Sequence, residues 1–156
     1  AAAGALLDDL IGYLRAALPQ LRGEASTLER EVALAAAYLR LSPAGRVGRL
    51  AVDVRVEAAA LPLAFPPMVL LPLAHGVAGQ PAARVTLATV GADGAPPWGI
   101  ALRVDATAQP TRWSDDTLAS LRTTLTQYFG ADAALEVGDA GAVVRCTGAR
   151  VSPAAA

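Results

Sequence analysis

Few side chains in this chain could carry out chemistry. The 156 residues include one histidine, His75, and one cysteine, Cys146, and they include neither lysine nor asparagine. Any mechanism that needs a lysine amine or an asparagine carboxamide is therefore excluded. A lone cysteine without neighbouring ligands forms neither an intrachain disulfide nor a zinc site. Cys146 is expected to be a small core residue in a reducing compartment.

The other candidates for chemistry are His75 and a few carboxylates. A lone histidine is most often structural, and we expect this role for His75, with a nucleotide contact or a metal ligand as alternatives. Asp105 follows an apolar alternating run, and Asp115 and Asp116 precede a helical pattern. Two carboxylates at a helix start stabilise the helix dipole but repel a bound anion.

The composition is that of one domain. A chain of 156 residues buries about two-thirds of the surface that it exposes when unfolded. A net charge of -1 with 17% charged residues predicts no nucleic-acid interface. Residues 58–83 carry no formal charge, but five prolines interrupt them, which disfavours a membrane span. We expect a cytoplasmic chain, joined to a membrane only through segments outside it.

Two helices are predicted before residue 42. Apolar residues recur at helical spacing from Leu6 to Leu18, and Pro19 is expected to close this helix. Ser26 and Glu29 have the form of a capping box, which predicts a second helix from there to about Leu41.

The rest of the chain is predicted to contain strands and two further helices. The third helix is expected to open at Pro66 and to kink at Pro72, and the fourth to end at Gly130. Alternation predicts five strands, the first with Val52 and Val54 on its covered face. The strands are 50–57, 84–90, 98–105, 134–137 and 142–151, and the fourth helix is 115–129. The sum is an α+β domain with a mixed, mostly antiparallel sheet, helices on one face and one helix before it.

Five short motifs follow one another along nearly the whole chain. Thr27–Leu39 fits the pattern T-L-x-x-E-L-x-x-x-x-x-Y-L, and Pro66–Leu73 fits P-P-x-x-L-Q-P-L with Leu71 in place of the glutamine. The other three motifs are Leu10–Leu18 for L-x-x-L-L-R-Y-x-L, Arg49–Leu50 for R-L, and 118–130 for L-x-x-x-x-x-R-L-x-x-x-Y-G. In this order they resemble the C-terminal region of a LytS-type sensor histidine kinase, whose ATP-binding domain is a GHKL (Bergerat-fold) ATPase.

The resemblance implies two parts and a set of partners. Residues 1–22 would be the C-terminal helix of a dimerisation and phosphotransfer hairpin, and residues 23–156 a GHKL ATPase-like domain with a Bergerat-type α/β sandwich. A homodimer through Leu6–Leu18 is expected, because an amphipathic helix needs a second surface for its apolar stripe. A response regulator is a further partner, and ATP with Mg²⁺ would be the cofactors of a functional site.

The first ATP motif of the family, E-N-A-x-x-H-G, directly follows P-L. Without a gap, this chain has His75 in the place of the glutamate and Gly76 in the place of the asparagine that coordinates Mg²⁺. A gapped register aligns His75 and Gly76 with the His-Gly of the motif. The magnesium ligand is missing in both registers.

The second motif, D-x-G-x-G, binds adenine through its aspartate. Asp105 stands in that place, where it would accept a hydrogen bond from the adenine amino group. Thr107 and Gln109 replace the two glycines, so side chains would crowd the nucleotide.

The third motif, G-x-G-L, places phosphates at a helix N-terminus. Asp115 and Thr117 replace its glycines, and only Leu118 is kept. Residues 110–114, before this helix, are too few for much of an ATP lid.

These departures leave several functions open. The first is a degenerate domain that does not bind Mg-ATP normally and acts as a regulatory or dimerisation module. The second is an active sensor histidine kinase that recognises adenine through Asp105 and phosphorylates a histidine upstream of this chain. The third is a scaffold that docks a response regulator or sequesters a partner kinase. An unrelated α/β domain with chance matches is the last alternative.

Overall fold

The computed structural model describes residues 2–21, 26–46, 49–78, 84–91, 98–105, 113–131 and 133–146. These residues form a five-stranded sheet and five helices, of which α3 is a single turn. The helices are α1 (Ala2–Leu21), α2 (Leu28–Leu41), α3 (Pro43–Arg46), α4 (Leu70–Ala78) and α5 (Asp115–Phe129). The strands are β1 (Ala51–Arg55), β2 (Arg84–Gly91), β3 (Trp98–Asp105), β4 (Ala133–Gly138) and β5 (Gly141–Cys146).

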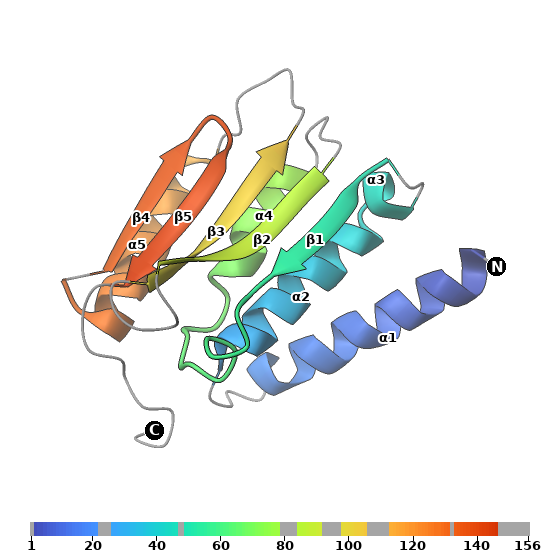
Figure 1. Cartoon of the computed structure of the whole chain (residues 1–156), viewed down its shortest axis with the longest axis horizontal. Coiled ribbons are helices and arrows are strands. Elements are labelled where there is room, and N and C mark those ends of the chain that lie inside the picture. The colour runs from blue at the N-terminus through green and yellow to red at the C-terminus, as the bar shows by residue number, and fades with distance from the viewer. Residues whose placement is uncertain are drawn as a thin grey trace.

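The sheet is mixed, with strand order β1-β2-β3-β5-β4. β1 and β2 are parallel, and the other neighbouring strands are antiparallel. A parallel pair needs a crossover, and α4 lies in the connection between β1 and β2. In Figure 1, α2, α4 and α5 lie behind the sheet, and α1 lies alongside α2. The α+β class and the mixed, mostly antiparallel sheet are therefore as predicted.

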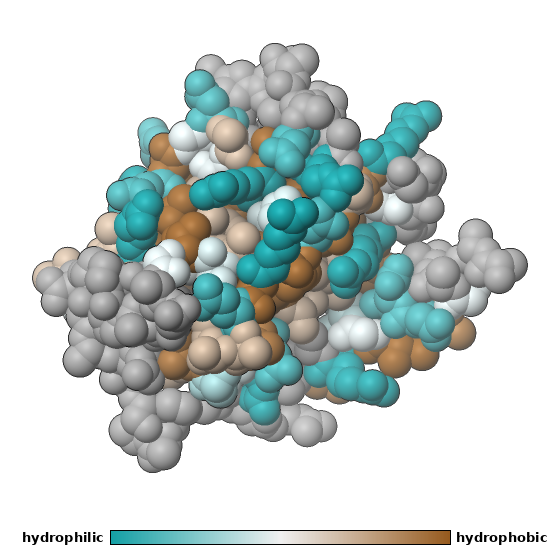
Figure 2. Space-filling model, viewed as in Figure 1, coloured by the Kyte–Doolittle hydropathy of each residue, from teal (hydrophilic) through white to brown (hydrophobic). Residues whose placement is uncertain are grey.

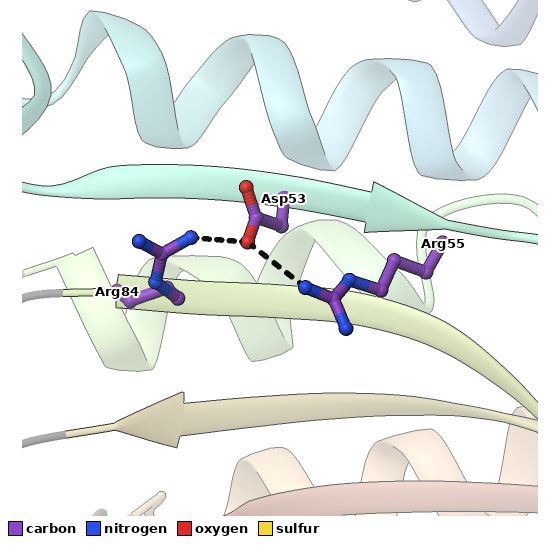
Figure 3. A network of polar contacts seen from close by, with 3 residues as sticks. All are labelled: Asp53, Arg55 and Arg84. Carbon is purple, nitrogen blue, oxygen red and sulfur yellow. Dashed lines mark hydrogen bonds and ion pairs between the residues drawn. The ribbon is translucent and has the colours of Figure 1, made fainter.

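Charged side chains of the strands gather on the opposite, open face of the sheet. Figure 2 shows hydrophilic residues across this face. Asp53 of β1 accepts a hydrogen bond from Arg84 of β2, and its carboxylate lies 3.8 Å from the guanidinium of Arg55 (Figure 3). Arg145 donates to Glu136 at 2.9 Å. These ion pairs are solvent-exposed, so each adds little to stability.

The core lies between the sheet and the three helices behind it. Phe65, in the loop before α4, is fully buried, and its ring meets that of Phe129 edge-on with centroids 6.0 Å apart. Cys146 is buried in the same core, as predicted, and burial raises the pKa of its thiol to about 12. Other fully buried large side chains are Leu28, Leu34, Leu39, Leu70, Leu73, Leu87, Ile100, Leu102 and Leu125.

The third helix begins later than predicted, at Leu70 and not at Pro66. Met68 has a φ of 61°, in the left-handed region, and a right-handed helix cannot run through such a residue. Pro72 is therefore the third residue of α4. The N–H groups of a first turn have no acceptor within the helix, so the hydrogen-bond loss expected at Pro72 does not arise.

The start of the second helix also differs from the prediction. Its N-cap is Thr27, whose Oγ1 accepts a hydrogen bond from the Arg30 N–H at 3.4 Å. Ser26 is buried, and its carbonyl accepts the Phe65 N–H at 3.2 Å. Thr27 forms a β-bridge with Ala64, and this holds its backbone in the extended conformation that an N-cap requires.

Two further expectations fail at α1 and β1. α1 continues past Pro19 and ends at Leu21. A proline clashes with the preceding turn and cannot donate a backbone hydrogen bond, but the residues after it can remain helical. Val54, predicted to be covered, is 43% exposed. β1 is an edge strand, so one of its sides has no neighbouring strand to shield it.

The elements from β2 onward agree closely with the prediction. α5 has the predicted bounds, and Gly130 follows it with a φ of 87° and donates to the Thr126 carbonyl at 2.8 Å. β4 and β5 turn at Asp139 and Ala140, and β5 is described as far as Cys146, whereas 147–151 lie outside the described residues. Among the helices of the described ranges, none has the length and apolar character needed to cross a membrane.

Candidate functional site

Those predicted site residues that the structure describes come from α4, β3 and α5. β2 begins and β3 ends at the same edge of the sheet, because Arg84 and Asp105 are register partners. Figure 1 shows the end of β3 at the upper edge of the sheet, with α4 behind β2 and β3. Trp113, which lies just before α5, contacts α4 through its indole.

A buried carboxylate from α2 positions the start of α4. Glu31 is fully buried, and its Oε1 accepts the N–H groups of Val69 at 2.9 Å and Leu70 at 3.3 Å. N–H groups at a helix start have no acceptor within the helix, and the positive end of the helix dipole favours a negative group. Glu31 is therefore an N-terminal cap supplied by another helix. This contact gives a physical role to the glutamate of the T-L-x-x-E-L pattern.

His75 joins the other end of α4 to α2. Its Nδ1 lies 2.5 Å from the hydroxyl oxygen of Tyr38, and the two ring centroids are 5.7 Å apart. Burial raises the pKa of the Tyr38 phenol, with a smaller contribution from Tyr13. Tyr38 therefore keeps its proton at neutral pH and can donate it to Nδ1. The contact links α4 to α2 at an exposed position, and the structural role of His75 stays a prediction.

Gly76 lies under the side chain of Trp113. A Cβ atom built on Gly76 would lie 2.2 Å from Nε1 and 2.4 Å from Cδ1 of the indole, far inside any real contact. Nε1 also donates to the carbonyl of Leu73, one turn earlier on α4, at 3.1 Å. The indole thus fills the space that a side chain at position 76 would need.

An N–H group at the start of α5 is already bonded to the N-cap side chain. Ser114 is the N-cap, and its Oγ accepts the Thr117 N–H at 3.1 Å and lies 2.8 Å from the Thr117 hydroxyl. Asp115 and Asp116 are exposed in the first turn, and Leu118 points into the core. An anion at this helix end would have to displace the cap and approach two carboxylates.

The positions predicted to bind adenine are only partly described. Asp105 is exposed at the end of β3. Thr107 and Gln109 lie outside the described residues. Within the described part of the chain, no cluster of three or more histidine, cysteine, aspartate or glutamate side chains could hold a metal ion.

Two surface cavities lie away from these positions. One, of about 510 Å³, surrounds the β4–β5 turn and is lined by Arg103, Glu136 and the glycines 138 and 141 among others. The other, of about 270 Å³, lies between α5 and β4 and includes Arg122 and Leu135. Neither is lined by a residue of the predicted nucleotide site.

Sequence reasoning missed the two residues that define the geometry here, Trp113 and Tyr38. Trp113 lies within residues 110–114, for which the sequence predicts only that they are too few for much of an ATP lid. A tryptophan directly before a helix N-cap is the signal that points to it. A comparison with models of known protein families finds no match to this chain, and a search of characterised proteins finds none either.

Proposed function

We propose that this chain is a GHKL-type, histidine-kinase-like domain with a degenerate nucleotide site, acting in two-component signalling as a regulatory or dimerisation module. Its support is the order of the motifs together with the mixed sheet and its one-sided helix layer. The Glu31 cap and the placement of Pro72 in the first turn of α4 also fit the family patterns that contain them.

The contact between Gly76 and Trp113 is the main support for the proposal that the nucleotide site is degenerate. In the ungapped register of the family pattern, position 76 is the asparagine that coordinates Mg²⁺. Here that position has no side chain, and an indole occupies the space above it. The exposed carboxylates of Asp115 and Asp116 add repulsion where the phosphates would approach the start of α5.

Titration calorimetry with Mg-ATP and Mg-ADP is expected to show no binding tighter than about 1 mM, which corresponds to about 4 kcal/mol. The physical reasons are the missing metal ligand and the filled space beside Gly76. An active LytS-type kinase domain measured in parallel is the control for the assay.

Micromolar binding would overturn the degenerate reading and favour the active-kinase alternative. The variant Asp105→Ala would then test adenine recognition, since the hydrogen bond from the adenine amino group is lost. Retained binding in that variant would exclude the role of Asp105.

The proposed dimer uses the outer face of α1. Leu7, Leu10 and Leu14 lie on this helix at helical spacing and are between 42% and 57% exposed, although α1 also packs against α2. Ile11 and Leu18 extend the same apolar stripe. A stripe of this kind on a helix is the pattern that a second helix covers in a bundle.

Sedimentation equilibrium is expected to show a concentration-dependent dimer that weakens at least tenfold in Leu10→Glu/Leu14→Glu. Burying two carboxylates in an apolar interface costs more than the 1.4 kcal/mol that a tenfold change represents. Asp8→Ser, on an exposed polar position of the same helix, is the matched control and should leave the dimer unchanged. A wild-type chain that remains monomeric at all concentrations would refute the α1 interface.

A further inference from the structure

Trp113 contacts α4 in the way that a bound ligand would. Its indole N–H makes a directed hydrogen bond to the Leu73 carbonyl at 3.1 Å, and its pyrrole edge fits against the backbone at Gly76. The ring is partly buried and packs against the hydrophobic core. One specific polar contact and one close-fitting apolar surface are the usual elements of a small-ligand site.

The indole covers the backbone of α4 from Leu73 to Gly76, and we call this place the recess. Two contacts with α2 hold α4 in position around it. Residue 75 is held to α2 by the Tyr38 hydroxyl, and the first turn of α4 is held to α2 by Glu31. Gly76 itself must lack a side chain, since a Cβ there would overlap the indole. Two contacts with α2 that do not involve Trp113 therefore hold α4 in place beside the indole.

We propose that this recess beside Gly76 is a binding site for a planar aromatic ring with an N–H donor, and that Trp113 is its built-in occupant. Because Trp113 directly precedes the N-cap Ser114, its docking also latches the start of α5 onto α4. The chain thereby keeps the two helices in contact without a bound nucleotide. Only the identification of this place with a former nucleotide site rests on the proposed function.

The carboxylates near the latch restrict what could replace the indole. Asp115 and Asp116 stand in the turn that follows Trp113. They disfavour an anionic ligand and leave neutral or cationic aromatic rings as the class that fits. Indole is the simplest member of this class and serves as the probe.

Trp113→Ala is expected to lower Tm by about 5 °C or more, and indole at about 2 mM should restore several degrees of that loss. Benzofuran has the same shape without the N–H donor, so its recovery should be several-fold weaker in apparent affinity. Wild-type protein, whose recess is filled, is the control and should show no Tm change with either compound.

A second variant keeps the test decisive if Trp113→Ala does not fold. Gly76→Ala alone should lower Tm and red-shift the emission of Trp113 in a Trp98→Phe background, because the new methyl group expels the indole into water. An alanine in a helix that met no obstacle would instead raise Tm. In the Trp113→Ala background, where no indole lies over residue 76, Gly76→Ala should therefore raise Tm.

An unchanged Tm in both single variants would overturn the latch, as would indole and benzofuran giving equal recovery. These outcomes are separate from the nucleotide assay. A failed latch without Mg-ATP binding would leave the degenerate-domain proposal intact. Mg-ATP binding by a protein that passes the indole test would refute that proposal and make Trp113 a displaceable gate.

Discussion

Glu31→Ala is expected to lower the free energy of unfolding by about 3 to 5 kcal/mol, because two buried N–H groups lose their acceptor. Oε1 of this fully buried side chain accepts from both Val69 and Leu70 at the start of α4. No water can replace a carboxylate there without opening the packing between α2 and α4. Urea unfolding followed by far-UV circular dichroism measures the loss.

Two matched variants separate the cap from the loss of side-chain volume and charge. Glu31→Gln keeps an oxygen in the same position and should cost about half as much or less, since the acceptor remains although its charge is gone. Glu29→Ala removes an exposed carboxylate from the same helix, and its effect should be within about 0.5 kcal/mol. Equal losses for Glu31→Ala and Glu31→Gln would contradict the assigned role.

Phe65→Ala is expected to cost about 3 to 5 kcal/mol through the lost ring and the cavity that it leaves. The side chain is fully buried, and its ring meets Phe129 at the end of α5. It therefore joins the loop before α4 to α5 across the core. The free energy of unfolding from the same urea experiment measures this effect.

Nearby substitutions provide the comparison for Phe65. Phe65→Leu retains most of the volume and should cost about 1 to 2 kcal/mol. Met68→Ala, three residues later and 49% exposed, should change stability by about 0.5 kcal/mol or less. A loss below about 1.5 kcal/mol for Phe65→Ala would mean that the core closes over the missing ring.

Most of the fold could be predicted because its signals are local. The alternation in 98–105 and the helical period in 115–129 depend only on neighbouring residues, and both have the predicted bounds. The errors at Ser26 and Pro66 have a different origin. The first reflects a bridge between Thr27 and Ala64, and the second a left-handed backbone at Met68. The first depends on a contact between residues distant in sequence, and the second on a single dihedral angle. Residue patterns encode neither.

The sequence alone predicts which residues of the candidate site depart from the family patterns, but not which side chains lie beside them. The prediction that Gly76 and Asp115 stand where the family has other residues rests on residue identity and stays a prediction. That the Trp113 indole lies over Gly76 is a contact between residues 37 positions apart, and residue patterns do not encode it. The Tyr38–His75 contact spans 37 positions, and a side-chain pair at such a separation has no signature in one sequence.

The cap from Glu31 also determines the order in which the molecule can assemble. α4 has nine residues, and a helix of this length does not persist alone in water. Its N-terminal acceptor comes from 38 positions earlier in the chain, so the loop between α2 and α4 must close before the helix gains its cap. We therefore expect α4 to become stable only when it has packed against α2. A nascent chain holds the recess beside Gly76 only after that closure.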